Sequence, residues 1–160
     1  MKKILIIDDS EAQRSNAERI AKEMGLEPVV CDPLTRGTDR GLDWMRHIPE
    51  VDYVVTDLMW RYRTDEDYYG QKPMGLMVAI HSLYFGKPVA ICTNDSDHHR
   101  GHHGEAIGFI HDGYLQPTCY FPDFNESAPF GWDDNKNWRS AIEQVIQLAE
   151  KQTTTTKSKA

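Results

Sequence analysis

The chain has 160 residues, a formal net charge of −7, and 39% hydrophobic and 27% charged residues. This length and composition are those of one globular domain, and the surplus of acids argues against binding the phosphates of nucleic acid, so we expect no DNA binding. No stretch approaches the roughly 20 apolar residues of a membrane helix, and the apolar run after Lys3 is shorter than the roughly 7–15 residues of a secretory signal. The three cysteines form no CxxC pair. We therefore expect a cytoplasmic protein that does not contact a membrane.

Strand-like and helix-like segments alternate along the chain. Short apolar runs predict strands at residues 4–7, 29–31, 53–56 and 89–93 and within 113–121, and helical periodicity predicts helices at 10–24, 36–48, 74–85 and 137–151 and within 103–112. We expect Ser10 to cap the first helix, Gly25 to end it and Pro49 to end the second. The apolar positions that predict the helix at 74–85 are Leu76, Met77, Ile80, Leu83 and Tyr84.

This alternation predicts an α/β fold in three layers, with a doubly wound five-stranded parallel sheet between two layers of helices. We expect a single domain over residues 1–151 with insertions near 60–73, 95–104 and 117–132. Residues 152–160 lack an apolar anchor, so we expect a flexible tail there.

Acidic residues follow two of the predicted strands. Asp8 and Asp9 end the first strand, Asp57 ends the third, and Thr93 ends the fourth. The carboxyl ends of parallel strands meet at one edge of a sheet, so these side chains should lie together. Clustered carboxylates repel one another and raise their pKa values or recruit a cation, and a set of oxygen ligands suits Mg²⁺. A carboxylate beside a divalent cation can act as a nucleophile toward phosphorus, so the pattern predicts a phosphoryl-accepting aspartate.

Three segments carry a resemblance to a known family, and they lie at residues 3–10, 54–59 and 88–93. Their order and spacing resemble those of the response-regulator receiver (CheY-like) family over about residues 1–115. The resemblance implies a flavodoxin-like fold, with Asp57 as the phosphoacceptor and Thr93 as the switch hydroxyl. It also implies that Asp57 and Asp9, with Asp8 assisting, hold Mg²⁺ together with the backbone carbonyl of Met59.

The chain departs from this family at one position. Receivers carry a lysine at the end of the fifth strand, usually followed by proline. One alignment, through Tyr114–Pro117, places Gln116 at that position, and another, through Cys119–Pro122, places Phe121 there. Because no lysine lies between Lys87 and Lys136, we expect an atypical receiver whose pocket lacks this cation.

Two of the insertions carry further candidates. In the first, Arg61 or Arg63 could replace the absent lysine, since a guanidinium can grip a phosphoryl group with two donors. In the second, clustered histidines could bind Zn²⁺ or a similar metal, although a solvated loop is the simpler interpretation. These histidines are His98, His99, His102 and His103.

The favoured interpretation is a stand-alone receiver-like signalling module of a two-component phosphorelay, with no enzymatic activity beyond self-phosphorylation and dephosphorylation at Asp57. Its partners would be a sensor histidine kinase or phosphotransfer protein and a downstream protein, and a homodimer is possible. An alternative is a pseudo-receiver that binds a partner without regulation by phosphorylation. The third interpretation is a small metal-dependent phosphohydrolase. The Asp-x-Asp nucleophile motif usual in aspartate phosphatases is missing at both acidic strand ends.

Overall fold

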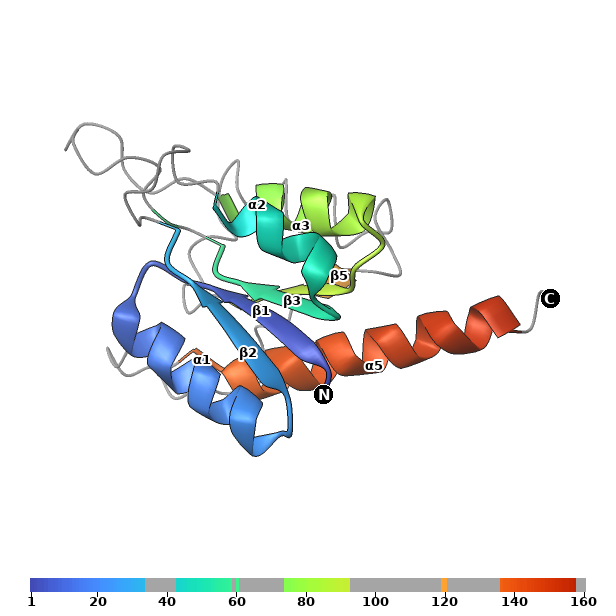
Figure 1. The fold of residues 1–160 in the computed structure, drawn as a ribbon, viewed down its shortest axis with the longest axis horizontal. Coiled ribbons are helices and arrows are strands. Elements are labelled where there is room, and N and C mark those ends of the chain that lie inside the picture. Colours follow the sequence, from blue (N-terminus) through green and yellow to red (C-terminus); the bar gives the residue numbers. More distant parts are fainter. Residues whose placement is uncertain (34–42, 59, 61–73, 93–118, 121–135, 158–160) are drawn as a thin grey trace, which may run out of the picture.

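The computed structural model describes residues 1–33, 43–58, 60, 74–92, 119–120 and 136–157, of which residues 119–120 and 152–157 are described by their backbone alone. Five strands form one sheet in the order β2-β1-β3-β4-β5 (Figure 1). Every neighbouring pair is parallel, which confirms the predicted sheet. The strands are β1 (Lys3–Ile7), β2 (Glu27–Cys31), β3 (Tyr53–Thr56), β4 (Val89–Ile91) and β5 (Cys119–Tyr120).

Helices cover both faces of the sheet, as the sequence predicts (Figure 1). One face carries α1 (Glu11–Glu23) and α5 (Trp138–Lys157), and the other carries α2 (Trp44–His47) and α3 (Met74–Tyr84). Successive residues of β1 enter opposite layers: Leu5 and Ile7 join the core under α2 and α3, whereas Ile4 and Ile6 join the core under α1 and α5. A strand buried on both faces is apolar throughout, which is why β1 reads as a continuous apolar run.

The ends of the first two helices follow from local chemistry. Ser10 caps α1 by accepting a hydrogen bond from the backbone N–H of Gln13, and Gly25 follows the helix with a φ of 76°. Both features are as predicted. The second helix, predicted over residues 36–48, is α2 (Trp44–His47) among the described residues, and residues 36–42 of that prediction lie outside them. A 3₁₀ turn, Ile48–Glu50, carries the chain through Pro49, so that proline does not end the helical backbone.

The face of α3 that packs against the sheet is not the face that carries its largest apolar side chains. The buried residues are Gly75, Val78, Ala79 and Ser82, whereas Met77, Ile80 and Tyr84 are 43%, 49% and 83% exposed. Helices with apolar residues on nearly every side give no clear periodicity. The small residues decide the orientation because they let the helix approach the sheet closely.

Helix α5 is longer than predicted. Its backbone is helical to Lys157, beyond the predicted end at residue 151. The flexible tail expected over residues 152–160 stays a prediction. The C-terminal part of α5 extends past the sheet (Figure 1). No helix in the described part of the chain has both the length and the apolar character of a membrane span. The helix predicted within 103–112 lies outside the described residues, as do the insertions predicted near 60–73, 95–104 and 117–132 except for residues 60, 119 and 120.

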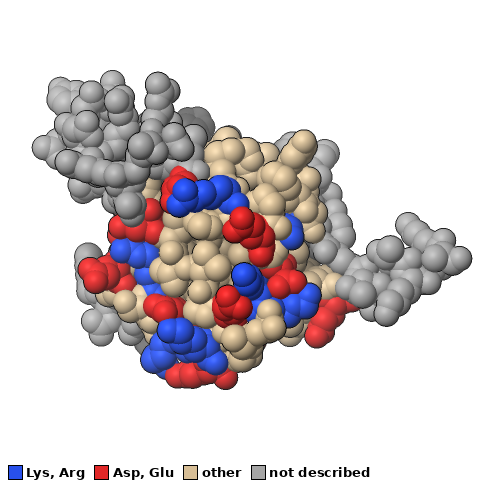
Figure 2. All heavy atoms as spheres, viewed as in Figure 1, with Lys and Arg blue, Asp and Glu red and all other residues tan. Residues whose placement is uncertain are grey.

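The surface charges on one face of the molecule are interspersed. On the face drawn in Figure 2, acidic and basic side chains alternate and do not gather by sign. Lys22 pairs with Glu18, and Arg139 of α5 pairs with Glu23 of α1. Such exposed pairs contribute little to stability, about 0–1 kcal/mol each. The buried acids described below are therefore distinct from the general acidity of the chain.

Substitution of Gly75 tests the close approach between α3 and the sheet. A Cβ atom at Gly75 would lie 2.1 Å from the carbonyl oxygen of Asp57. Alanine normally stabilises a helix relative to glycine by about 0.5–1 kcal/mol, but here we expect Gly75→Ala to destabilise the protein by about 1–3 kcal/mol through overpacking. Urea unfolding measures the sign.

The control is Gly86→Ala, at a φ of 64° with no atom within 4 Å of the added Cβ. It should cost about 1–2 kcal/mol through backbone conformation alone. A stabilising Gly75→Ala would show that α3 does not press against the turn after β3.

Candidate functional site

Three carboxylates meet at the carboxyl ends of β1 and β3. Asp8 and Asp9 follow β1, Asp57 follows β3, and one oxygen from each lies within 4.8 Å of the others. Asp8 is fully buried, Asp57 is 5% exposed, and Asp9 is half-buried. Adjacent parallel strands bring these residues together, and the backbone N–H of Asp57 donates to the carbonyl of Ile7 (2.8 Å). The predicted acidic pocket is confirmed as an arrangement of side chains.

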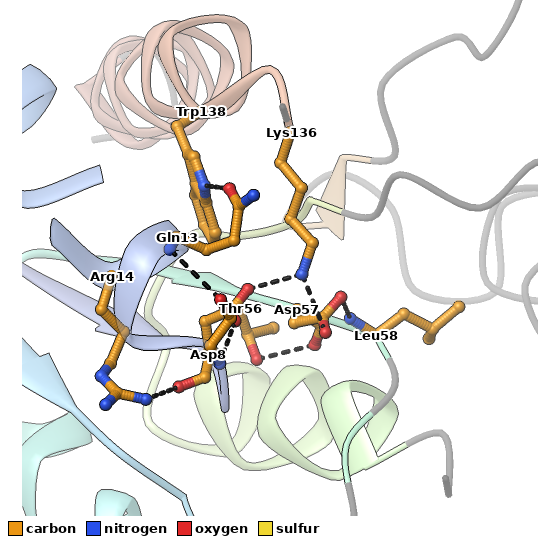
Figure 3. Close-up of polar contacts among 9 residues, drawn as sticks. Asp8, Gln13, Arg14, Thr56, Asp57, Leu58, Lys136 and Trp138 are labelled. Atoms are coloured by element: carbon orange, nitrogen blue, oxygen red, sulfur yellow. Dashed lines mark hydrogen bonds and ion pairs between the residues drawn. The ribbon is translucent and has the colours of Figure 1, made fainter. Parts of the chain in front are cut away.

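A buried lysine joins two of these carboxylates. Lys136 Nζ lies 2.5 Å from Asp8 Oδ2 and 2.9 Å from Asp57 Oδ2, as Figure 3 shows. The lysine is only 8% exposed. The expectation of a pocket without a cation is therefore wrong.

The position of this lysine explains why its role was missed. It lies directly before α5, whereas β5 ends at Tyr120, so spacing from the fifth strand did not lead to it. The strand itself carries no lysine, as predicted. One signal in the sequence could have found Lys136, because it is the only lysine between Lys87 and Lys151.

Several predicted residues fall outside the described part of the chain. They are Thr93, Met59, both candidates for the lysine position (Gln116 and Phe121), both arginines (Arg61 and Arg63) and all four histidines (His98, His99, His102 and His103). Their roles stay predictions.

Backbone groups hold the second oxygen of each buried carboxylate. Asp8 Oδ1 accepts from the N–H of Ser10 (2.7 Å), and Asp57 Oδ1 accepts from the N–H of Leu58 (2.7 Å). Each carboxylate thus has one oxygen fixed by the main chain and the other paired with the lysine. Hydrogen bonds to the charged form favour ionisation, so these contacts offset part of the cost of burial.

Other side chains fix the backbone on either side of the acids. Arg14 Nη1 donates to the carbonyl of Asp8 (2.7 Å), and Arg14 Nη2 lies 3.3 Å from Asp32 Oδ2. On the neighbouring strand, Thr56 Oγ1 donates to the carbonyl of Asp57 (2.9 Å). The backbone N–H of Gly75 donates to the carbonyl of Leu58 (3.0 Å). The pocket is therefore built on tightly bonded strand ends.

The electrostatics of the pocket shift the ionisation of its groups. Burial, assisted by the charge of Asp8, raises the pKa of Asp57 to about 6, although Lys136 opposes the shift. Burial and the charge of Asp8 also raise the pKa of Asp9. Burial lowers the pKa of Lys136, but the charges of Asp57 and Asp8 outweigh it and raise the pKa overall.

The donor set fits Mg²⁺. All three groups that could act as ligands are carboxylates, which are hard oxygen donors. One ammonium offsets only one of three negative charges when all three acids are ionised, so a divalent cation would balance the remainder. Asp9 is the most exposed of the three and offers the open side of the site.

Comparison with solved structures finds the same fold in several receiver domains. A receiver domain from Clostridium thermocellum aligns with a TM-score of 0.54 at 17% identity, covering 96% of this chain and 98% of that one. A CheY-like receiver from Methanospirillum hungatei gives 0.55 at 16%, covering 96% and 98%. A de novo designed Rossmann 2x3 protein also aligns, with 0.51 at 13% identity, covering 92% and 90%. No protein-family model and no curated protein matches the chain. These likenesses establish a receiver-like, doubly wound α/β fold.

Replacing the buried lysine tests its role in stability. Lys136→Met leaves two buried carboxylates without their cation, so we expect a loss of about 3–5 kcal/mol at pH 7 in urea unfolding. The exposed pair of Lys22 and Glu18 provides a matched control, for which Lys22→Met should cost less than about 0.5 kcal/mol. Equal costs for the two variants would contradict a buried ion pair.

The raised pKa of Asp57 predicts a pH dependence of stability. The carboxyl binds its proton more tightly in the folded protein than in the unfolded chain. Its contribution to stability is therefore complete below pH 4 and is lost as the pH rises through 6. Relative to Asp57→Asn, the wild type should lose about 3 kcal/mol between pH 4 and pH 7.

Asp52 is a control whose pKa is shifted in the opposite direction to that of Asp57. Slight burial raises the pKa of Asp52, but hydrogen bonds from Lys2 and from the backbone N–H of Lys3 outweigh it and lower the pKa. Relative to Asp52→Asn, the wild type should gain stability as the pH rises through 4. A flat difference between the wild type and Asp57→Asn would show that Asp57 is not held in a costly charged state.

Proposed function

We propose that this protein is a signalling module of the response-regulator receiver type that accepts a phosphoryl group on Asp57. The observation that carries the proposal is the buried Lys136 ammonium between Asp8 and Asp57. Burying these charges is expensive, and apolar residues would stabilise the same strand ends at lower cost. A chemical role that needs a carboxylate, a cation and neighbouring acids accounts for their presence.

The chemistry follows from the position of each group. One oxygen of Asp57 attacks phosphorus of a phosphodonor, the bond between phosphorus and its leaving group breaks, and an acyl phosphate forms on the aspartate. The leaving group departs with the bonding electron pair. The ammonium of Lys136, 2.9 Å from Asp57 Oδ2, is placed to offset charge on the phosphoryl oxygens. Asp57 must be ionised to attack, so protonation of its carboxyl at low pH should slow the reaction.

Asp9 and Asp57 would hold Mg²⁺, with Asp8 assisting and the backbone carbonyl of Met59 completing the protein ligands. When bound, the metal supplies positive charge that lowers the repulsion between the pocket and an incoming phosphoryl group. Thr93 follows Cys92, whose backbone N–H bonds to the carbonyl of Thr56 beside the pocket (2.8 Å). We retain Thr93 as the proposed switch hydroxyl. The proposed partners are a histidine kinase or phosphotransfer protein and a downstream protein.

A second function is favoured by the exposed apolar residues of α3. Met77, Ile80 and Tyr84 would suit contact with a protein partner without any phosphorylation. In that case the acidic pocket would serve only to hold the strand ends. The two functions make different predictions for the reactivity of Asp57.

The decisive experiment is incubation of the protein with Mg²⁺ and acetyl phosphate, followed by intact-mass and peptide analysis. We expect one phosphoryl group per chain on Asp57, and none in Asp57→Asn. Absence of modification at pH 7 to 8 in a folded wild type would overturn the proposal and favour the interaction module. Continuous release of phosphate over many turnovers would indicate a phosphohydrolase instead.

Lys136→Met should change metal binding and phosphorylation in opposite directions. Removing the ammonium relieves its repulsion of Mg²⁺, so the affinity for Mg²⁺ should rise. The rate of phosphorylation at saturating Mg²⁺ should fall on the order of tenfold or more, because a charge that faces the reacting group is lost. Calorimetric titration with MgCl₂ and the acetyl phosphate assay measure the two effects. A parallel fall in both would indicate a disrupted pocket.

A further inference from the structure

Lys136 reaches the pocket from the segment before a helix and not from a strand of the sheet. It lies two residues before Trp138, the first residue of α5, and not on the strand that borders β4. A lysine side chain has four rotatable carbons and is easily displaced. Some other contact must therefore hold the backbone of Lys136 at a fixed distance from Asp8 and Asp57.

The structure contains a closed ring of contacts that includes this lysine. Asp8 accepts from the N–H of Ser10, and the hydroxyl of Ser10 accepts from the N–H of Gln13 (3.4 Å). The side-chain oxygen of Gln13 accepts from Trp138 Nε1 (3.0 Å), and the backbone N–H of Trp138 donates to the carbonyl of Lys136 (2.9 Å). Lys136 then returns to Asp8 (Figure 3).

The link between Gln13 and Trp138 is the only part of this ring that joins the two helices. Trp138 is fully buried and Gln13 is 5% exposed, so neither side chain can exchange its partner for bulk water. The ammonium of Lys136 also lies 5.8 Å from the centre of the Trp138 indole, within the range of a cation–π contact. Trp138 therefore contacts Lys136 in two ways: its ring lies beside the ammonium, and its backbone N–H binds the carbonyl of Lys136. Its indole N–H binds Gln13.

We propose that Gln13 and Trp138 are positioning residues that hold the Lys136 ammonium against Asp8 and Asp57. A buried polar pair costs free energy to desolvate, and two apolar side chains would pack α1 on α5 without that cost. The directional hydrogen bond fixes the start of α5, and with it the point from which Lys136 extends. The inference deepens the proposed function, because the pocket it positions is the proposed phosphoryl acceptor.

The test uses Gln13→Met, which removes the acceptor and keeps an unbranched side chain of similar length. The first readout is the rate at which formaldehyde and cyanoborohydride methylate Lys136, followed by peptide mass spectrometry. We expect this rate to rise about three- to tenfold, the shift that loss of one buried hydrogen bond produces. The exposed amines of Lys2 and Lys22 should methylate at unchanged rates and serve as internal references. This readout does not require Asp57 to accept phosphate.

The second readout is the rate of modification of Asp57 by acetyl phosphate with saturating Mg²⁺. It should fall by a similar factor in Gln13→Met, and Gln13→Met should have no further effect in a Lys136→Met background. If Gln13→Met slowed the modification of Asp57 by the same factor in the wild-type and the Lys136→Met backgrounds, the two variants would act independently. That result would overturn a positioning role.

Two further variants keep the test decisive. Arg139→Met breaks the exposed ion pair that also joins α5 to α1 but does not reach the pocket, so it should leave the methylation of Lys136 unchanged. Trp138→Phe keeps an aromatic ring and removes the donor, so it should reproduce the effect of Gln13→Met if that variant does not fold. Unchanged methylation of Lys136 in a folded Gln13→Met or Trp138→Phe protein would refute the inference. If the wild type is not phosphorylated but methylation responds as expected, the proposed function fails and the positioning role stands.

Discussion

The fold is organised around one ammonium buried between two buried carboxylates. Lys136 is the only described positive charge that contacts both Asp8 and Asp57, and both acids lie at the ends of central strands. Removing such charges from water costs several kcal/mol per ion, which the attraction between them returns only when the geometry is good. The backbone N–H groups of Ser10 and Leu58 improve that geometry by binding the remaining oxygens. Any element that places one of these three groups therefore contributes to the stability of the others.

Several features of the fold serve this geometry. Adjacent parallel strands fix the separation of Asp8 and Asp57, and the absence of a side chain at Gly75 lets α3 begin against the turn that follows β3. Arg14 and Thr56 bind main-chain carbonyls at the two strand ends. Only Lys136 comes from a segment outside the central strands, so its placement depends on how α5 packs against α1 and β3. The acidic side of the pocket is held by strand pairing and backbone hydrogen bonds, whereas its basic side relies on helix packing.

The acidic and basic sides of the pocket also differ in how well the sequence predicts them. The acidic side consists of short-range patterns: an apolar run followed by acids predicts a buried strand and a charged strand end, and parallel pairing predicts that Asp8, Asp9 and Asp57 meet. The basic side depends on a contact between residues 128 positions apart, across a stretch of chain whose length the strand pattern does not constrain. The face of α3 was equally hard to assign, because Val78 and Met77 are both apolar, and close packing selected the smaller residue. Local periodicity thus predicts which elements form but does not determine which of several apolar faces packs inward.

The likeness in fold is weaker evidence for function than these charges. A de novo designed protein aligns with this chain over a similar extent to natural receivers, so the arrangement of strands and helices is compatible with proteins of very different origin. A stable doubly wound fold does not require carboxylates of raised pKa at its strand ends, because apolar or singly charged residues would suffice there. The pKa of Asp57 of about 6, the two neighbouring acids and a buried lysine from the segment before α5 together impose a cost that folding alone does not explain. The energetic cost of the pocket is therefore what favours the proposed phosphoryl transfer.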